Sequence, residues 1–164
     1  MSSECTSSDH GRRLEQVMAL LERAAEGLSR SRIRLFEQHS IDADWVCSIE
    51  EKPEREDIME SFVSKFNRFQ DMLGDKLLPV LLAWKGEHRG AFIDNLNRAE
   101  RLGLVASASQ WMEARSLRNR LVHEYMVDAE EFAQSLRLAN ELSQMLLQTW
   151  KNIQAYVENS HAAE

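Results

Sequence analysis

The chain of 164 residues has few of the residues on which several common protein classes depend. Its two cysteines, Cys5 and Cys47, form no CxxC pair and are too few for a disulfide scaffold. Its five histidines include no pair three or four residues apart, so the sequence predicts no helical metal site. A glycine-rich phosphate loop is also missing. We therefore expect neither a metal ion nor another cofactor.

Long apolar stretches are equally scarce. The longest run, Leu77 to Trp84, has eight residues and includes Pro79, whereas a membrane-spanning helix needs about 20. Residues 1–12 lack the apolar segment of a secretory signal. We expect a cytoplasmic protein without membrane association. The length suits one domain with a substantial core, over residues 1–164, with a flexible leader at 1–8 and a frayed tail at 158–164.

The charge balance argues against a protein that coats nucleic acid. The formal net charge is −7, and nucleic-acid binding draws on phosphate neutralisation by lysine and arginine. The charge is unevenly distributed, however. Residues 42–60 hold eight acids against two bases, and residues 98–120 hold five arginines against two acids. This distribution is compatible with a small basic groove, although a mixed solvated surface is its commonest meaning.

Apolar residues recur every three or four positions along most of the chain, which is the period of amphipathic helices. The first predicted helix begins near residue 9, with Asp9 as its cap, and ends at His39. The stretch 41–52 is acidic and irregular, and Trp45 and Ile49 should anchor it to the rest of the protein.

A second helix is predicted from Pro53, because proline in the first turn followed by acidic residues is typical of a helix start. Pro79 lies inside this helix and should kink it, since proline lacks the backbone donor and crowds the preceding turn. Three more helices are predicted at about 91–102, 108–126 and 128–157.

Local signals support these last boundaries. Gly103 is a helix stop, and Ser107 with Gln110 and Asp128 with Glu131 have the spacing of capping boxes. No segment has a convincing strand pattern. The sequence therefore predicts an all-α fold, a five-helix, mostly up-and-down bundle.

The fourth predicted helix carries an unusual group of side chains near its end. Residues 118–125 read Arg-Asn-Arg-Leu-Val-His-Glu-Tyr. Histidine suits proton transfer, because its ordinary pKa of about 6.5 leaves both forms populated near neutral pH. Arginine suits a phosphate, because its planar fork donates two parallel hydrogen bonds. We assign His123 to acid–base chemistry and Arg118 to phosphate binding, with Asn119 and Arg120 assisting at a phosphate oxygen or an imidazole nitrogen.

The spacing of these residues sets a geometric condition. On an ideal helix Arg118 and His123 lie roughly 140° apart, so one straight helix does not bring them together. Either the helix ends or distorts near His123, or a second copy of the motif completes the site across a two-fold interface.

The motif resembles the RxxxxHxY signature of HEPN-superfamily toxins of the HepT type. Arg118, Asn119, His123 and Tyr125 match, and a looser likeness in helix order extends over about residues 53–157. The resemblance implies a metal-independent endoribonuclease that acts on RNA and is a homodimer, with the motif in a groove between the two protomers. It also implies an MNT-type nucleotidyltransferase antitoxin that attaches AMP to Tyr125 and so blocks the site.

Two other hypotheses remain open. In one, the chain is a non-catalytic subunit that docks a nucleotidyltransferase and presents Tyr125, or a nucleotide, to it. In the other, the chain is a plain helical interaction protein, in which the arginines are solvated, His123 caps or packs, and Tyr125 fills the edge of the core.

Overall fold

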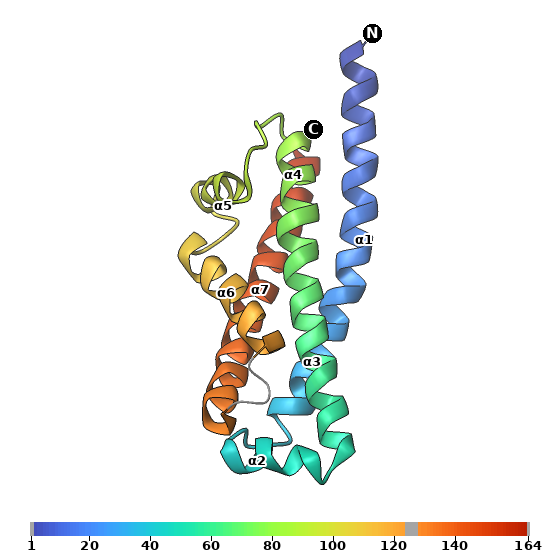
Figure 1. Cartoon of the computed structure of the whole chain (residues 1–164). Coiled ribbons are helices and arrows are strands. Elements are labelled where there is room, and N and C mark those ends of the chain that lie inside the picture. The colour runs from blue at the N-terminus through green and yellow to red at the C-terminus, as the bar shows by residue number, and fades with distance from the viewer. Residues whose placement is uncertain (1, 124–127, 164) are drawn as a thin grey trace.

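The computed structural model describes residues 2–123 and 128–163, and within these ranges the chain forms helices and short connections without a β-strand (Figure 1). The all-α prediction is confirmed for this part of the chain. The elements are α1 Ser2–Phe36, α2 Ala43–Cys47, the 3₁₀-helix η1 Ser48–Glu50, α3 Pro53–Asp71, the π-helix η2 Met72–Leu77, α4 Leu78–Trp84, α5 Phe92–Arg101, α6 Ala108–His123 and α7 Ala129–Ala162.

Three long helical rods run along the molecule: α1, the continuous rod of α3, η2 and α4, and α7 (Figure 1). Helices α5 and α6 cover one flank, and α2 lies at the end opposite the chain termini. No helix within the described ranges is both long enough and apolar enough to span a bilayer.

Leucines every seven residues on α1 face phenylalanines of α3, and these side chains form the centre of the core. Phe62, Phe66 and Phe69 are fully buried, and the ring of Phe62 meets Phe36 edge to face at 4.9 Å between centroids. Three phenylalanines three or four residues apart are thus packed inside the bundle and are not exposed for base stacking. The buried leucines of α1 are Leu14, Leu21, Leu28 and Leu35.

Both terminal helices are longer than predicted. Helix α1 begins at Ser2 rather than near residue 9, and α7 continues to Ala162 rather than ending near residue 157. Asp9 is an exposed residue inside α1 and not its cap. Extending a formed helix costs little, because each added residue gains a hydrogen bond for one residue fixed. Local capping signals therefore locate these ends poorly.

The predicted irregular stretch is partly helical. It contains α2 and η1, and Asp42 caps α2 by accepting a hydrogen bond from the Trp45 backbone N–H at 2.8 Å. Trp45 and Ile49 are buried, as predicted for an anchor. Among the described residues, α2 is thus a helix beyond the five predicted ones when α3, η2 and α4 are taken as one rod.

The distortion predicted at Pro79 takes the form of a widened turn ahead of it. Pro79 lies in the first turn of α4. The six residues that precede α4 in the rod, Met72–Leu77, are π-helical. Because proline cannot donate a backbone hydrogen bond and its ring crowds the carbonyl four residues earlier, the preceding turn opens while the rod continues.

The predicted starts of the last two helices are confirmed. Ser107 Oγ accepts a hydrogen bond from the Gln110 backbone N–H at 3.2 Å, and Asp128 Oδ1 accepts one from Glu131 at 3.0 Å. Gly103 has a φ of 73° just after α5, in the left-handed region that glycine tolerates at a helix end.

Candidate functional site

Helix α6 carries the motif on its last turns, with one face buried in the bundle. Trp111, Ala114, Leu117 and Leu121 form the buried face. Asn119 points away from the core and is exposed. Burial of the leucines therefore leaves Asn119 at the surface of the molecule.

Arg118 is held by a carboxylate of the neighbouring rod. Its Nη1 donates a hydrogen bond to Oδ1 of Asp71, at the end of α3. The two side chains are 34% and 37% exposed, so this ion pair lies at the surface and not in the core. The guanidinium is placed by its partner and remains open to solvent.

A second ion pair lies beside the first. Arg115 Nη1 is 3.6 Å from Oδ1 of Asp75, and the guanidinium carbon of Arg115 lies 4.1 Å from the ring centroid of Phe92 in α5. Asp71 and Asp75 are one helical turn apart on the rod, and Arg115 and Arg118 are one turn apart on α6. The two pairs thus join α6 to the rod at adjacent levels.

Gly74 permits the close approach of α5 and α6 at this point. A Cβ added to Gly74 would lie 2.9 Å from Cε2 of Phe92 and 3.3 Å from Cζ2 of Trp111. A side chain here would displace one of these rings. The π-helical segment therefore brings a glycine, and not a larger residue, against the elements that carry Arg115 and Arg118.

Behind the ion pairs lies a narrow cleft with unused polar groups. The amide of Gln70, which is 3% exposed, and the indole N–H of Trp111 have no hydrogen-bond partner in the part of the chain described. Both residues line the cleft, together with Asp71, Asp75, Phe92 and Arg115. Such groups are normally paired in proteins, and here they add to the polar lining that Asp71, Asp75 and Arg115 give the cleft.

The structure places only part of the predicted site. Arg118, Asn119 and Arg120 lie on the final turns of α6. His123 is the last residue of that helix, and only its backbone is described. The side chain of His123 and the whole of Tyr125 lie outside the described residues. The predicted convergence of His123 on Arg118, within one chain or between two, stays a prediction.

The arginines between residues 98 and 120 do not by themselves form the basic groove that their number suggested. Arg98 lies 3.6 Å from a carboxylate oxygen of Glu87, and Arg115 and Arg118 pair with aspartates of the rod. Three of the five arginines in this stretch are therefore locally neutralised.

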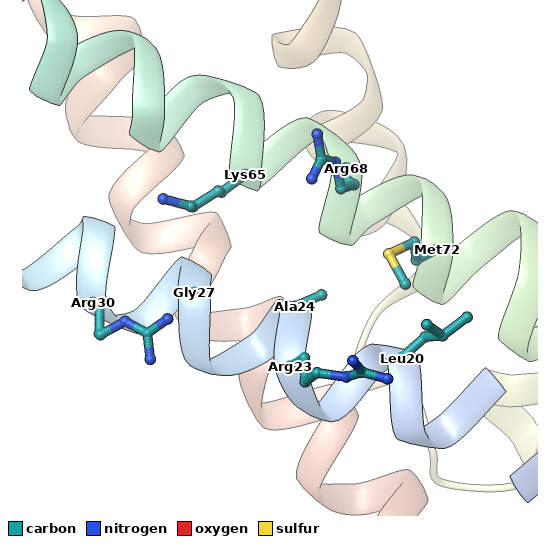
Figure 2. A pocket seen from close by; sticks show the side chains of 8 residues that line it. All are labelled: Leu20, Arg23, Ala24, Gly27, Arg30, Lys65, Arg68 and Met72. Carbon is teal, nitrogen blue, oxygen red and sulfur yellow. The ribbon is translucent and has the colours of Figure 1, made fainter. Parts of the chain in front are cut away.

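Sequence reasoning missed a cationic groove elsewhere, between α1 and the rod (Figure 2). Its volume is about 440 Å³. The lining residues are Leu20, Arg23, Ala24, Gly27, Arg30, Lys65, Arg68 and Met72. The two halves of this lining are some forty residues apart in the chain, so a local count of charges does not reveal it. The sequence offered one sign of the groove, which is that these cations stand next to the apolar stripes of their helices.

No family model, curated protein or solved structure matches the chain.

Proposed function

We propose that the protein is a metal-independent endoribonuclease toxin of the HEPN type, regulated by a minimal nucleotidyltransferase. The observation that carries the proposal is the sequence motif of Arg118, Asn119, His123 and Tyr125, of which the first three belong to the last turns of α6. The described part of this motif is accessible: Asn119 is exposed and Arg118 is partly exposed.

The proposed reaction uses the nucleophile that RNA carries. The ribose 2′-oxygen attacks the adjacent phosphorus, its proton passes to a base, and the bond from phosphorus to the 5′-oxygen breaks as that oxygen takes up a proton. The products are a 2′,3′-cyclic phosphate and a 5′-hydroxyl end. His123 transfers protons, Arg118 stabilises the charge that gathers on the phosphate oxygens, and Asn119 and Arg120 assist.

The ion pair between Arg118 and Asp71 is compatible with this role. Ion pairs exposed to this degree contribute about 0–1 kcal/mol to stability, so a phosphate can replace the carboxylate at little expense. Before RNA binds, Asp71 holds the guanidinium in one place, and after binding the phosphate takes over the same hydrogen-bond donors.

The proposal includes a homodimer and an inhibitory partner. A second protomer supplies the side of the site that one helix lacks, because on an ideal helix Arg118 and His123 lie roughly 140° apart. AMP transferred to Tyr125 by an MNT-type nucleotidyltransferase places a phosphodiester against Arg118 and His123, where it competes with RNA.

A second candidate function has one observation in its favour. Because Asp71 and Asp75 already neutralise Arg118 and Arg115, these arginines have a structural use that requires no RNA. A docking subunit that presents Tyr125 to a nucleotidyltransferase without cleaving RNA is consistent with this pairing. Such a protein gains the mass of AMP with its partner and ATP, and leaves RNA intact when purified alone.

Cleavage of total cellular RNA and growth arrest on expression test the ribonuclease. Arg118→Ala should abolish both while the protein stays folded by circular dichroism. Arg89→Ala is the matched control, since Arg89 is exposed in the loop before α5. Undiminished cleavage by Arg118→Ala removes the proposed phosphate ligand, whereas intact RNA with the wild-type protein favours the docking subunit.

A further inference from the structure

The groove between α1 and the rod has a cationic half and an apolar half. Figure 2 shows Arg30 and Lys65 toward one end, Arg23 and Arg68 next to them, and Leu20 with Met72 toward the other end. The cations come from both walls, since Arg23 and Arg30 belong to α1 and the other two to α3. A ligand that fills the groove meets positive charge at one end and an apolar surface at the other.

These four cations carry charge that their neighbours leave unneutralised. In the described ranges, no ion pair joins Arg23, Arg30, Lys65 or Arg68 to a carboxylate. The groove lining contains no acid, although the chain as a whole has 27 acids against 20 bases. The groove is thus positive within a negatively charged protein.

A neighbouring groove on the other side of α1 shows that this charge pattern is specific. It has the same volume of about 440 Å³ and lies between α1 and α7. Glu22 and Glu26 line it beside Arg30 and Lys151, so its charge is mixed. Of these two grooves, only the one facing α3 has charged residues of a single sign.

Lys65 is positioned by hydroxyl groups in place of a carboxylate. Its Nζ donates a hydrogen bond to Oγ of Ser61 at 2.9 Å, and Ser61 Oγ lies 3.3 Å from Oγ of Ser31 on α1. Ser31 is 6% exposed, so this chain of hydroxyls lies in the seam between the two helices. The ammonium is therefore held in place and keeps its full charge for a ligand.

Gly27 leaves the floor of the groove open where helix packing does not require a glycine. An added Cβ would meet only the Lys65 side chain, at 3.7 Å from its Cε, which is an ordinary contact. Glycine in the middle of a helix is unfavourable relative to alanine. An alanine therefore fits at this position, and a larger side chain would extend toward Lys65 and fill the groove.

We propose that this groove binds a single-stranded RNA segment, with phosphates on the four cations and a base on Leu20 and Met72. The inference deepens the proposed ribonuclease function and rests on it for the identity of the polyanion. Arg68 is one helical turn before Asp71, the partner of Arg118, so an RNA strand in the groove is led along the rod toward the motif. A positively charged groove suits a single strand, because it follows the backbone phosphates without sequence preference.

Binding of a labelled 2′-O-methyl oligonucleotide, over a series of salt concentrations, tests the groove independently of cleavage. This probe lacks the nucleophile, so it measures binding alone. The double variant Lys65→Gln/Arg68→Gln should bind roughly twentyfold more weakly at 0.1 M salt, and the slope of log K against log salt should flatten by about 1.4. Arg89→Gln/Arg101→Gln, which removes the same charge from exposed positions near α5, should bind like wild type.

Gly27 provides a test that leaves the charge unchanged. Gly27→Leu should fill the groove and weaken binding, whereas Gly27→Ala, which fits, should bind like wild type. Binding of AMP, measured at the same concentrations, distinguishes an RNA strand from a free mononucleotide as the ligand. Much tighter binding of the oligonucleotide than of AMP supports an RNA strand. Equal affinity for AMP overturns the strand and leaves a mononucleotide pocket.

Three outcomes overturn the groove proposal: no binding by wild type, equal binding by the Lys65→Gln/Arg68→Gln variant, or equal loss in the Arg89→Gln/Arg101→Gln control. A change of oligomeric state in the groove variant without loss of RNA binding also overturns it and makes the groove a protein interface. If the groove variants lose binding while the wild type never cleaves RNA, the groove stands and the ribonuclease falls. If the groove variants bind RNA like wild type while Arg118→Ala abolishes cleavage, the ribonuclease stands and the groove proposal falls.

Discussion

The Arg118 guanidinium holds Asp71 in this structure, and the proposed reaction requires the same atoms to hold a phosphate. The two uses are separable by substitution. In Asp71→Asn the guanidinium loses its carboxylate and keeps its own charge, whereas Arg118→Ala removes the phosphate ligand itself. The activities of these two variants therefore decide whether Arg118 only joins α6 to α3 or also binds a phosphate.

We expect Asp71→Asn to cleave RNA at least as fast as wild type and to lose less than about 1 kcal/mol of unfolding free energy, because the pair is partly exposed. Arg118→Ala should lose about 10²–10³ in cleavage rate, as when one donor to a transition-state oxygen is removed. Single-turnover cleavage and urea unfolding measure the two effects, with Asp75→Asn as the matched control on the adjacent pair. If Asp71→Asn lost as much cleavage activity as Arg118→Ala, the role of Arg118 would be only to join α6 to α3.

Gly27 allows a prediction on stability at a single position of α1. Gly27→Ala should stabilise the protein by about 0.5–1 kcal/mol, because alanine restricts the unfolded chain and its Cβ meets only ordinary contacts. Urea unfolding of the two proteins measures the change. Destabilisation by Gly27→Ala would mean that helix packing requires the glycine.

At this scale the sequence identified the unusual residues but not their partners. Arg118 stood out because arginine, asparagine, histidine and tyrosine share one short segment. Asp71 lies 47 residues earlier, and nothing in its own surroundings marks it as the partner of an arginine. A contact between two helices depends on how their faces meet, which the sequence of neither helix specifies alone.

At the scale of elements, the π-helical segment and α5 meet at Gly74. Gly74→Ala should cost about 1–3 kcal/mol, because the added methyl group overlaps the ring of Phe92 and crowds Trp111. Gly27→Ala is again the control, as an alanine placed at a helical glycine without a close contact. Unfolding free energy and the near-ultraviolet signal of the tryptophans report the change, and unaltered stability would show that the rings move aside freely.

The starts of helices α6 and α7 were more predictable than the outer ends of α1 and α7 and the distortion before Pro79. Ser107 and Asp128 were recognised as caps because a side-chain oxygen three residues before a backbone N–H is a local pattern. The outer ends of α1 and α7 were placed too far inward, since a helix continues wherever propagation is cheap. Pro79 signalled a distortion, but nothing in the sequence showed that it takes the form of a π-helical segment over Met72–Leu77.

At the scale of the molecule, the all-helical fold followed from periodicity, whereas the groove of Figure 2 did not. The groove exists because α1 and α3 lie side by side, which brings Arg23 and Arg30 opposite Lys65 and Arg68. The net charge of −7 pointed away from RNA, and only the arrangement of the helices shows where positive charge is left unpaired.

The proposed homodimer gives a prediction for the whole molecule. Light scattering after size-exclusion chromatography, at two protein concentrations, should show a mass of twice 19.0 kDa. Mixing inactive Arg118→Ala with inactive His123→Ala should restore part of the cleavage if each site draws these two residues from different protomers. A monomer at both concentrations that still cleaves RNA would contradict a shared site.

Cleavage of total cellular RNA by wild type beside His123→Ala, with EDTA present and with analysis of the new ends, tests the ribonuclease most directly. We predict that wild type cuts RNA into fragments with 5′-hydroxyl and 2′,3′-cyclic phosphate ends, and that His123→Ala is slower by about 10²–10⁴. Intact RNA with the wild-type protein, or equal cleavage by His123→Ala, would contradict it.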